Sequence, residues 1–103
     1  MAEEQSVESE IARIRLPREG EVLGIVTEML GASKMRIECD DGYTRLGRLT
    51  GKLRLRVWIR TGDLVLVEPW KVQSNERCDI IWRYTRTQAN WMQKKGIIKR
   101  LRF

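Results

Sequence analysis

The chain has 103 residues, a length that suits one domain with a modest hydrophobic core. Twenty basic residues stand against 14 acidic ones and there is no histidine, so the formal net charge is +6. No apolar run reaches the roughly 18 residues that a membrane-spanning helix needs. The acidic, polar first residues resemble neither a signal peptide nor a transit peptide. We therefore expect a cytoplasmic protein without a membrane partner.

The charges are unevenly distributed along the chain. Residues 1–10 contain four glutamates and no basic residue, so the remaining 93 carry all 20 basic and 10 of the 14 acidic side chains, a net of +10. A basic folded body favours a polyanion such as nucleic acid as its partner. Catalysis has little support, because no histidine is present for proton transfer at neutral pH and no glycine-rich phosphate loop precedes a helix. We expect neither an enzyme nor a cofactor.

The two cysteines, Cys39 and Cys78, are far apart in the chain and belong to no Cys-x-x-Cys motif. Without histidine, two cysteines do not supply the four ligands that a zinc site needs. We expect no metal, and we interpret both as buried thiols of a reducing compartment.

The N-terminal part of the chain predicts a tail followed by a barrel. Residues 1–17 are highly charged and show no periodicity, which is typical of a flexible acidic tail. Barrel strands are expected within residues 18–85. Residues 21–30 are rich in β-formers, and Gly24 within them indicates a bend or bulge. Residues 34–40 alternate strictly between apolar and charged side chains, as a half-buried strand does.

A third strand should return antiparallel over residues 43–50, because Asp40-Asp41-Gly42 is a hairpin signal. Gly47 breaks the alternation of this strand, so we predict a bulge there. We expect the basic side chains of Arg45 and Arg48 to face a partner.

Two more strands follow. Residues 64–68 form a continuous apolar run that Pro69 ends, which predicts a strand buried on both faces or nearly so. Residues 79–84 predict a fifth strand.

The period then changes to that of a helix. Thr85 and Gln88 have the spacing of a capping box, and Gly96 suits a left-handed C-terminal cap. We place a helix at about 86–95, within a helical segment 86–96, and a basic tail at 97–103.

Five short strands and a terminal helix predict an all-β fold, a five-stranded antiparallel OB-fold barrel with a C-terminal helix and a disordered N-terminal tail. Such barrels bind oligonucleotides on the face of strands 2 and 3 and on the adjoining loops. On this face we expect four basic residues, Lys34, Arg36, Arg45 and Arg48.

The stretch 51–60 is the most basic of the chain, and no carboxylate lies between Asp41 and Asp63. We expect it to be a short helical turn or an irregular connection. Arginine side chains bind phosphates and stack on bases, and a tryptophan ring provides a face on which a base can stack. The alternative is an edge strand whose basic face is merely solvated.

Each aromatic residue could likewise contact RNA or pack within the protein. For Trp58 we favour stacking on a base, and the alternative is a plug of the barrel. Trp82 is expected in the core and Trp91 between its helix and the barrel. Trp70 is left undecided, and Tyr43 could stack on a base or pack across the hairpin.

Two runs together resemble translation initiation factor 1A, the archaeal and eukaryotic relative of bacterial initiation factor 1. The first run is Gly-Lys-Leu-Arg-Leu-Arg-Val-Trp-Ile at 51–59 and the second is Thr-Gly-Asp-Leu-Val-Leu-Val at 61–67. The likeness extends over about residues 18–96, and Leu55 departs from it, since relatives often carry a basic residue there.

The resemblance implies a non-enzymatic OB-fold protein, monomeric when free, that sits in the aminoacyl site of the small ribosomal subunit. It would bind rRNA there, promote loading of initiator tRNA and mRNA, and cooperate with other initiation factors. The implied RNA-binding residues are Lys34, Arg36, Arg45, Arg48, Lys52, Arg54, Arg56 and Trp58. The alternatives are a general single-stranded RNA-binding chaperone and a protein–protein adaptor with a basic face.

Overall fold

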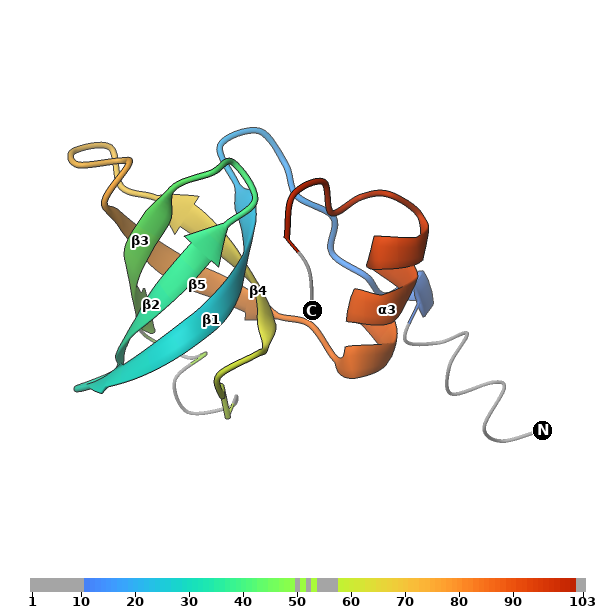
Figure 1. The fold of residues 1–103 in the computed structure, drawn as a ribbon, viewed down its shortest axis with the longest axis horizontal. Helices are drawn as coiled ribbons and strands as arrows, with labels where there is room; N and C mark the ends of the chain where they lie inside the picture. The colour runs from blue at the N-terminus through green and yellow to red at the C-terminus, as the bar shows by residue number, and fades with distance from the viewer. Residues whose placement is uncertain (1–10, 50, 52, 54–57, 102–103) are drawn as a thin grey trace.

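The computed structural model describes residues 11–49, 51, 53 and 58–101. The barrel strands, labelled as in Figure 1, are β1 (Val22–Gly31), β2 (Lys34–Cys39), β3 (Thr44–Leu49), β4 (Leu64–Pro69) and β5 (Arg77–Arg83), and helix α3 (Arg86–Lys94) follows them. The strands close into a barrel in the order β1-β2-β3-β5-β4, and β4 pairs with β1. The predicted all-β barrel with a C-terminal helix is confirmed.

One strand pair departs from the expected antiparallel pattern. β3 and β5 run parallel, whereas the other neighbouring strands in the described sheet are antiparallel. A parallel pair joins strands that lie far apart in the chain, so no hairpin turn in the sequence predicts the pairing. This pair places the start of β5 beside the middle of β3, with Arg77 opposite Leu46.

The centre of the barrel is filled by Ile37 of β2, which is completely buried. A Cβ atom on Gly24 of β1 would lie 2.4 Å from the Cγ2 atom of Ile37, and one on Gly47 of β3 would lie 2.3 Å from its Cδ1 atom. Both glycines therefore leave the space that Ile37 occupies. Cys39 and Cys78 are free and buried in the same cluster, as predicted.

Neither glycine lies at a bulge. Gly47 pairs regularly with Met35, so the predicted bulge in β3 is wrong. In β1 the register with β2 shifts between Val26 and Glu28, beyond Gly24. A glycine inside a strand can mark a bulge or a close approach, and here both positions are close approaches.

A second cluster joins the barrel to α3, which Figure 1 shows beside it. Met92 and Ala89 of the helix are buried there, and Trp91 is partly buried against the same cluster, as predicted. Tyr84 is also buried, and this burial raises the pKa of its hydroxyl to about 12. Its hydroxyl donates a hydrogen bond to the carbonyl oxygen of Arg15.

The ends of α3 follow the sequence signals. The hydroxyl of Thr85 accepts a hydrogen bond from the N–H of Gln88 at 3.2 Å, and the N–H of Thr85 donates to the Gln88 side chain at 3.0 Å. Gly96 has φ +72°, the left-handed conformation expected of a helix cap. None of the described helices is long and apolar enough to cross a membrane.

The segment after α3 returns to the barrel. The carboxylate of Asp40, at the end of β2, accepts hydrogen bonds from the backbone N–H groups of Lys99, Arg100 and Leu101, the shortest at 2.6 Å. Leu101 is buried in the second cluster. The described part of the predicted C-terminal tail is thus packed on the barrel.

Trp82 is not in the core as predicted, since 40% of its surface is exposed. The pairing of β4 with β5 shifts register between Leu66 and Val67, which face Trp82 and Ile80 respectively. The shift interrupts the alternation along β5 and turns Trp82 outwards while Ile80 stays inside.

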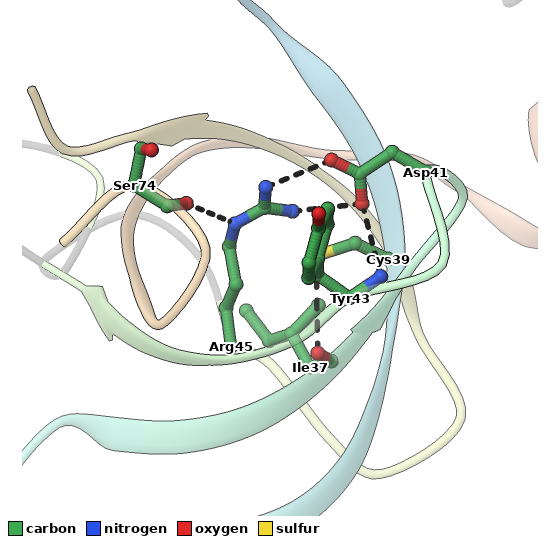
Figure 2. A network of polar contacts seen from close by, with 6 residues as sticks. All are labelled: Ile37, Cys39, Asp41, Tyr43, Arg45 and Ser74. Carbon is green, nitrogen blue, oxygen red and sulfur yellow. Dashed lines mark hydrogen bonds and ion pairs between the residues drawn. The ribbon is translucent and has the colours of Figure 1, made fainter.

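Arg45 also departs from its prediction, because only 3% of the residue is exposed. Its guanidinium donates two hydrogen bonds, of 2.9 and 2.8 Å, to the Asp41 carboxylate, and its Nε donates to the Ser74 carbonyl at 2.6 Å (Figure 2). It also lies 5.3 Å from the ring centroid of Tyr43. With β3 regular, Arg45 points inwards together with Gly47 and Leu49, so it does not face a partner.

The ion pair sets the charge state of Asp41. Burial alone would raise the pKa of this carboxyl, but hydrogen bonds from Arg45 and from the Tyr43 N–H outweigh burial and hold the pKa below its ordinary value. A carboxyl with a lower pKa in the folded state stabilises the fold above its unfolded pKa, and this contribution is lost as the pH falls through the folded pKa.

We therefore expect the free energy of unfolding of the variant Asp41→Asn to depend less on pH below about pH 4 than that of the wild type. At neutral pH it should be less stable than the wild type, because a buried guanidinium is left without its counter-charge. On acidification the wild type should lose more of its free energy of unfolding than the variant does. Urea unfolding over a pH series measures both effects, and Glu38→Gln, on the exposed face of β2, is the control. Parallel pH profiles for wild type and Asp41→Asn would contradict this account.

Candidate nucleic-acid interface

The outer face of β2 presents the two basic residues predicted there. Lys34 and Arg36 are exposed, while Met35 and Ile37 between and beyond them are buried. The Nη1 atom of Arg36 lies 3.1 Å from a carboxylate oxygen of Glu28 on β1, and both side chains are about half exposed. The alternation of β2 therefore fixes these cations on the solvent side of the barrel.

Arg48 is the third predicted residue on this face, and it lies directly opposite Lys34 in the β2–β3 pair. Its Nε donates to the Oδ1 atom of Asp79 at 3.2 Å, and the two side chains are 48% and 34% exposed. Exposed ion pairs contribute only about 0–1 kcal/mol to stability. A phosphate can therefore replace Glu28 as the partner of Arg36 at little cost.

Trp58 is exposed on 76% of its surface, so it is not a plug of the barrel. Its carbonyl oxygen accepts a hydrogen bond of 3.0 Å from the Nη1 atom of Arg83, which ends β5. Trp58 is thus held at the end of β5 opposite to Arg77. The seven residues of β5 place these ends about 20 Å apart.

The structure unites only part of the predicted set. Three of the eight residues, Lys34, Arg36 and Arg48, lie together on the outer face of β2 and β3. Arg45 lies inside, and Trp58 stands at another part of the surface. Three further predicted residues, Lys52, Arg54 and Arg56, fall outside the described residues, as does most of the stretch expected to be a turn.

Two residues that sequence reasoning did not assign complete this face. Trp70, directly after β4, donates from Nε1 to the Oδ1 atom of Asp79 at 2.9 Å. The guanidinium carbon of Arg48 lies 4.9 Å from the Trp70 ring centroid, and that of Arg77 lies 5.7 Å from it. These are cation–π distances. The pairing of β3 with β5 creates the group, and no short sequence spacing could have revealed it.

Comparisons with known proteins agree with this architecture. The family model described as Translation initiation factor 1A / IF-1 matches residues 11–102. Translation initiation factor 1A of Methanothermobacter thermautotrophicus is 52% identical over 90 residues, which cover 87% of this chain and 91% of the relative. The protein of the same name from Methanococcus aeolicus is 56% identical over 89 residues, which cover 84% of this chain and 85% of the relative.

Among solved structures, a similar fold occurs in the solution structure of translation initiation factor 1 from the Wolbachia endosymbiont of Brugia malayi. The TM-score is 0.50 at 32% identity, and the match covers 67% of this chain and 82% of that one. The closed five-stranded barrel is an OB-fold. From the family match over residues 11–102 and these relatives, we conclude that the chain belongs to the translation initiation factor 1A family and has a role in translation initiation.

Proposed function

We propose that this protein binds rRNA in the aminoacyl site of the small ribosomal subunit and promotes loading of initiator tRNA and mRNA. It acts in the cytoplasm together with other initiation factors, is monomeric when free, and works by binding alone, without catalysis or a cofactor. The membership of the family and the basic, aromatic surface of the barrel support this proposal.

The observation that carries the proposal is the exposure of Trp58. An indole is large and apolar, and 76% of this one faces solvent, although the described residues form two hydrophobic clusters that could bury it. Aromatic side chains on basic surfaces provide platforms on which bases stack. The sequence places Trp58 two residues after Arg56 and near Lys52 and Arg54, and these three cations would hold the adjoining phosphates.

The outer face of β2 and β3 supplies further phosphate contacts. Lys34, Arg36 and Arg48 face outwards from the barrel, and the ion pairs of the two arginines with acidic residues are exposed to water. The proposed RNA-binding set is therefore the predicted one without Arg45, whose guanidinium is bound by Asp41 and Ser74 inside the protein.

A small-subunit binding assay separates this function from its alternatives. A general RNA chaperone binds many single strands equally and shows no preference for the subunit. An adaptor whose basic face binds an acidic protein should not co-sediment with purified small subunits. The proposed factor should co-sediment with purified small subunits and resist competition by bulk RNA.

The double variant Arg54→Ala/Arg56→Ala should bind small subunits at least about tenfold more weakly than the wild type, because it loses two phosphate contacts. Co-sedimentation with purified subunits at fixed salt measures the effect. The matched control is Arg13→Ala/Arg18→Ala, which removes the same charge from two exposed positions near the N-terminal end of the described chain. Equal loss in both double variants would show that only net charge matters. Unfolding of the Arg54/Arg56 variant would instead assign these residues a structural role.

Truncation of Trp58 to alanine should weaken RNA binding by about 1–3 kcal/mol, the contribution of one stacked base. The free energy of unfolding should change by no more than about 0.5 kcal/mol, because the side chain is largely exposed. Subunit affinity and urea unfolding of the same samples give the two values. Leu16→Ala, which shortens another exposed apolar side chain, is the control and should leave both unchanged. A Trp58→Ala variant that binds as tightly as the wild type would show that Trp58 does not stack on a base.

A further inference from the structure

A small pocket of about 90 Å³ opens on the outer face of the barrel where β2, β3 and β5 meet. Its walls are formed by five residues from four segments of the chain, Lys34, Leu46, Arg48, Trp70 and Arg77. We call it the Trp70 pocket. Only part of it was anticipated, because Trp70 and Arg77 were not among the predicted binding residues.

The pairing of the strands brings these residues together. Lys34 on β2 lies opposite Arg48 on β3. Two residues before Arg48 on the same strand, Leu46 lies opposite Arg77 of β5. The backbone N–H of Trp70 donates to the carbonyl of Arg77 at 3.0 Å, which continues the β4–β5 pairing beyond Pro69. Four of the five wall residues thus come from strands, and Trp70, directly after β4, is bound to the start of β5.

The charged side chains that line the Trp70 pocket are all positive. Three of its five wall residues are cations, and none is a carboxylate. Asp79 holds the Nε atom of Arg48 from the neighbouring hollow, which is lined by Glu68 and Asp79 among others. Within the described part of the chain, neither Lys34 nor Arg77 forms an ion pair. Like charges gathered around one small space repel one another unless an anion lies between them.

Trp70 makes a fixed wall of this pocket. Its Nε1 atom is bound to Asp79 at 2.9 Å, and the guanidinium groups of Arg48 and Arg77 lie 4.9 and 5.7 Å from its ring centroid. Asp79 therefore holds both the indole and Arg48 in place, and the terminal guanidinium nitrogens of Arg48 are not used by Asp79.

We propose that the Trp70 pocket binds a phosphate group, and that in the assembled initiation complex this is a backbone phosphate of RNA. The space is of phosphate size, and three separate cations can each approach one oxygen of a tetrahedral anion. The RNA source rests on the proposed function, whereas the phosphate chemistry rests on the pocket alone. Arg77 and Trp70 thus extend the RNA surface from β2 and β3 to β5.

The indole N–H resonances of the four tryptophans make a direct test, each assigned by its own Trp→Phe variant. Inorganic phosphate is added to the full chain at constant ionic strength, with chloride as the balancing anion. We expect the Trp70 resonance to shift and saturate. In Lys34→Gln and in Arg77→Gln the dissociation constant should rise about tenfold or more, because each variant loses one charge-assisted hydrogen bond. Arg13→Gln is the matched control, since Arg13 is exposed, does not line the pocket and lies outside the proposed RNA-binding set.

A second arm replaces phosphate with a single-stranded RNA oligonucleotide. Here both Trp58 and Trp70 should respond, and Arg77→Gln should reduce the response of Trp70 while that of Trp58 remains. This pattern assigns the phosphate in the pocket to RNA. A saturable shift with inorganic phosphate but none with RNA would overturn the RNA source.

The proposal fails if the Trp70 resonance does not respond to phosphate, if acetate shifts it equally, or if Arg77→Gln binds phosphate as the wild type does. The acetate result would favour an acidic protein as the ligand. None of these outcomes touches the proposed function as long as Trp58 responds to RNA and the chain binds small subunits. Loss of both Trp58 response and subunit binding would instead refute the proposed function.

Discussion

The close packing of Ile37 between Gly24 and Gly47 is the constraint on which the rest of the barrel depends. A Cβ atom at either glycine would come within 2.4 Å of Ile37, so β1, β2 and β3 fit together in this arrangement. A slip of one residue would exchange the inner and outer faces of a strand. With Ile37 inside the barrel, the alternation of β2 places Lys34 and Arg36 on the solvent side. The surface chemistry of the protein follows from how its interior is filled.

The same constraint separates Arg45 from Arg48. Three residues apart in a regular strand, they must point to opposite sides, and only a bulge between them would place both outside. β3 is regular at Gly47, so Arg48 faces the proposed RNA surface and Arg45 is enclosed with Asp41. Arg45 then acts within the fold: it ties the β2–β3 turn, through Asp41, to the loop that carries Ser74. A cluster of basic residues in a sequence can thus serve both structure and binding.

Local signals predicted local structure well. The alternation of β2, the apolar run of β4 and the capping box at Thr85 each depend on neighbouring residues, and all three are confirmed. Features made by distant residues were missed. The parallel pairing of β3 with β5 assembles Trp70 with Arg48 and Arg77, and a register shift in the β4–β5 pair turns Trp82 outwards. No residue's immediate neighbours encode these arrangements, and the Trp70 side of the candidate site depends on them.

The central claim is that this OB-fold binds rRNA through several phosphate contacts made by basic residues around exposed aromatic rings. The dependence of small-subunit affinity on salt concentration tests it most directly, measured at constant Mg²⁺ with the full chain. Neutralisation of about five phosphates predicts that log K falls with log salt with a slope of roughly −3.5 to −4.5. An affinity that does not change with salt would contradict the claim.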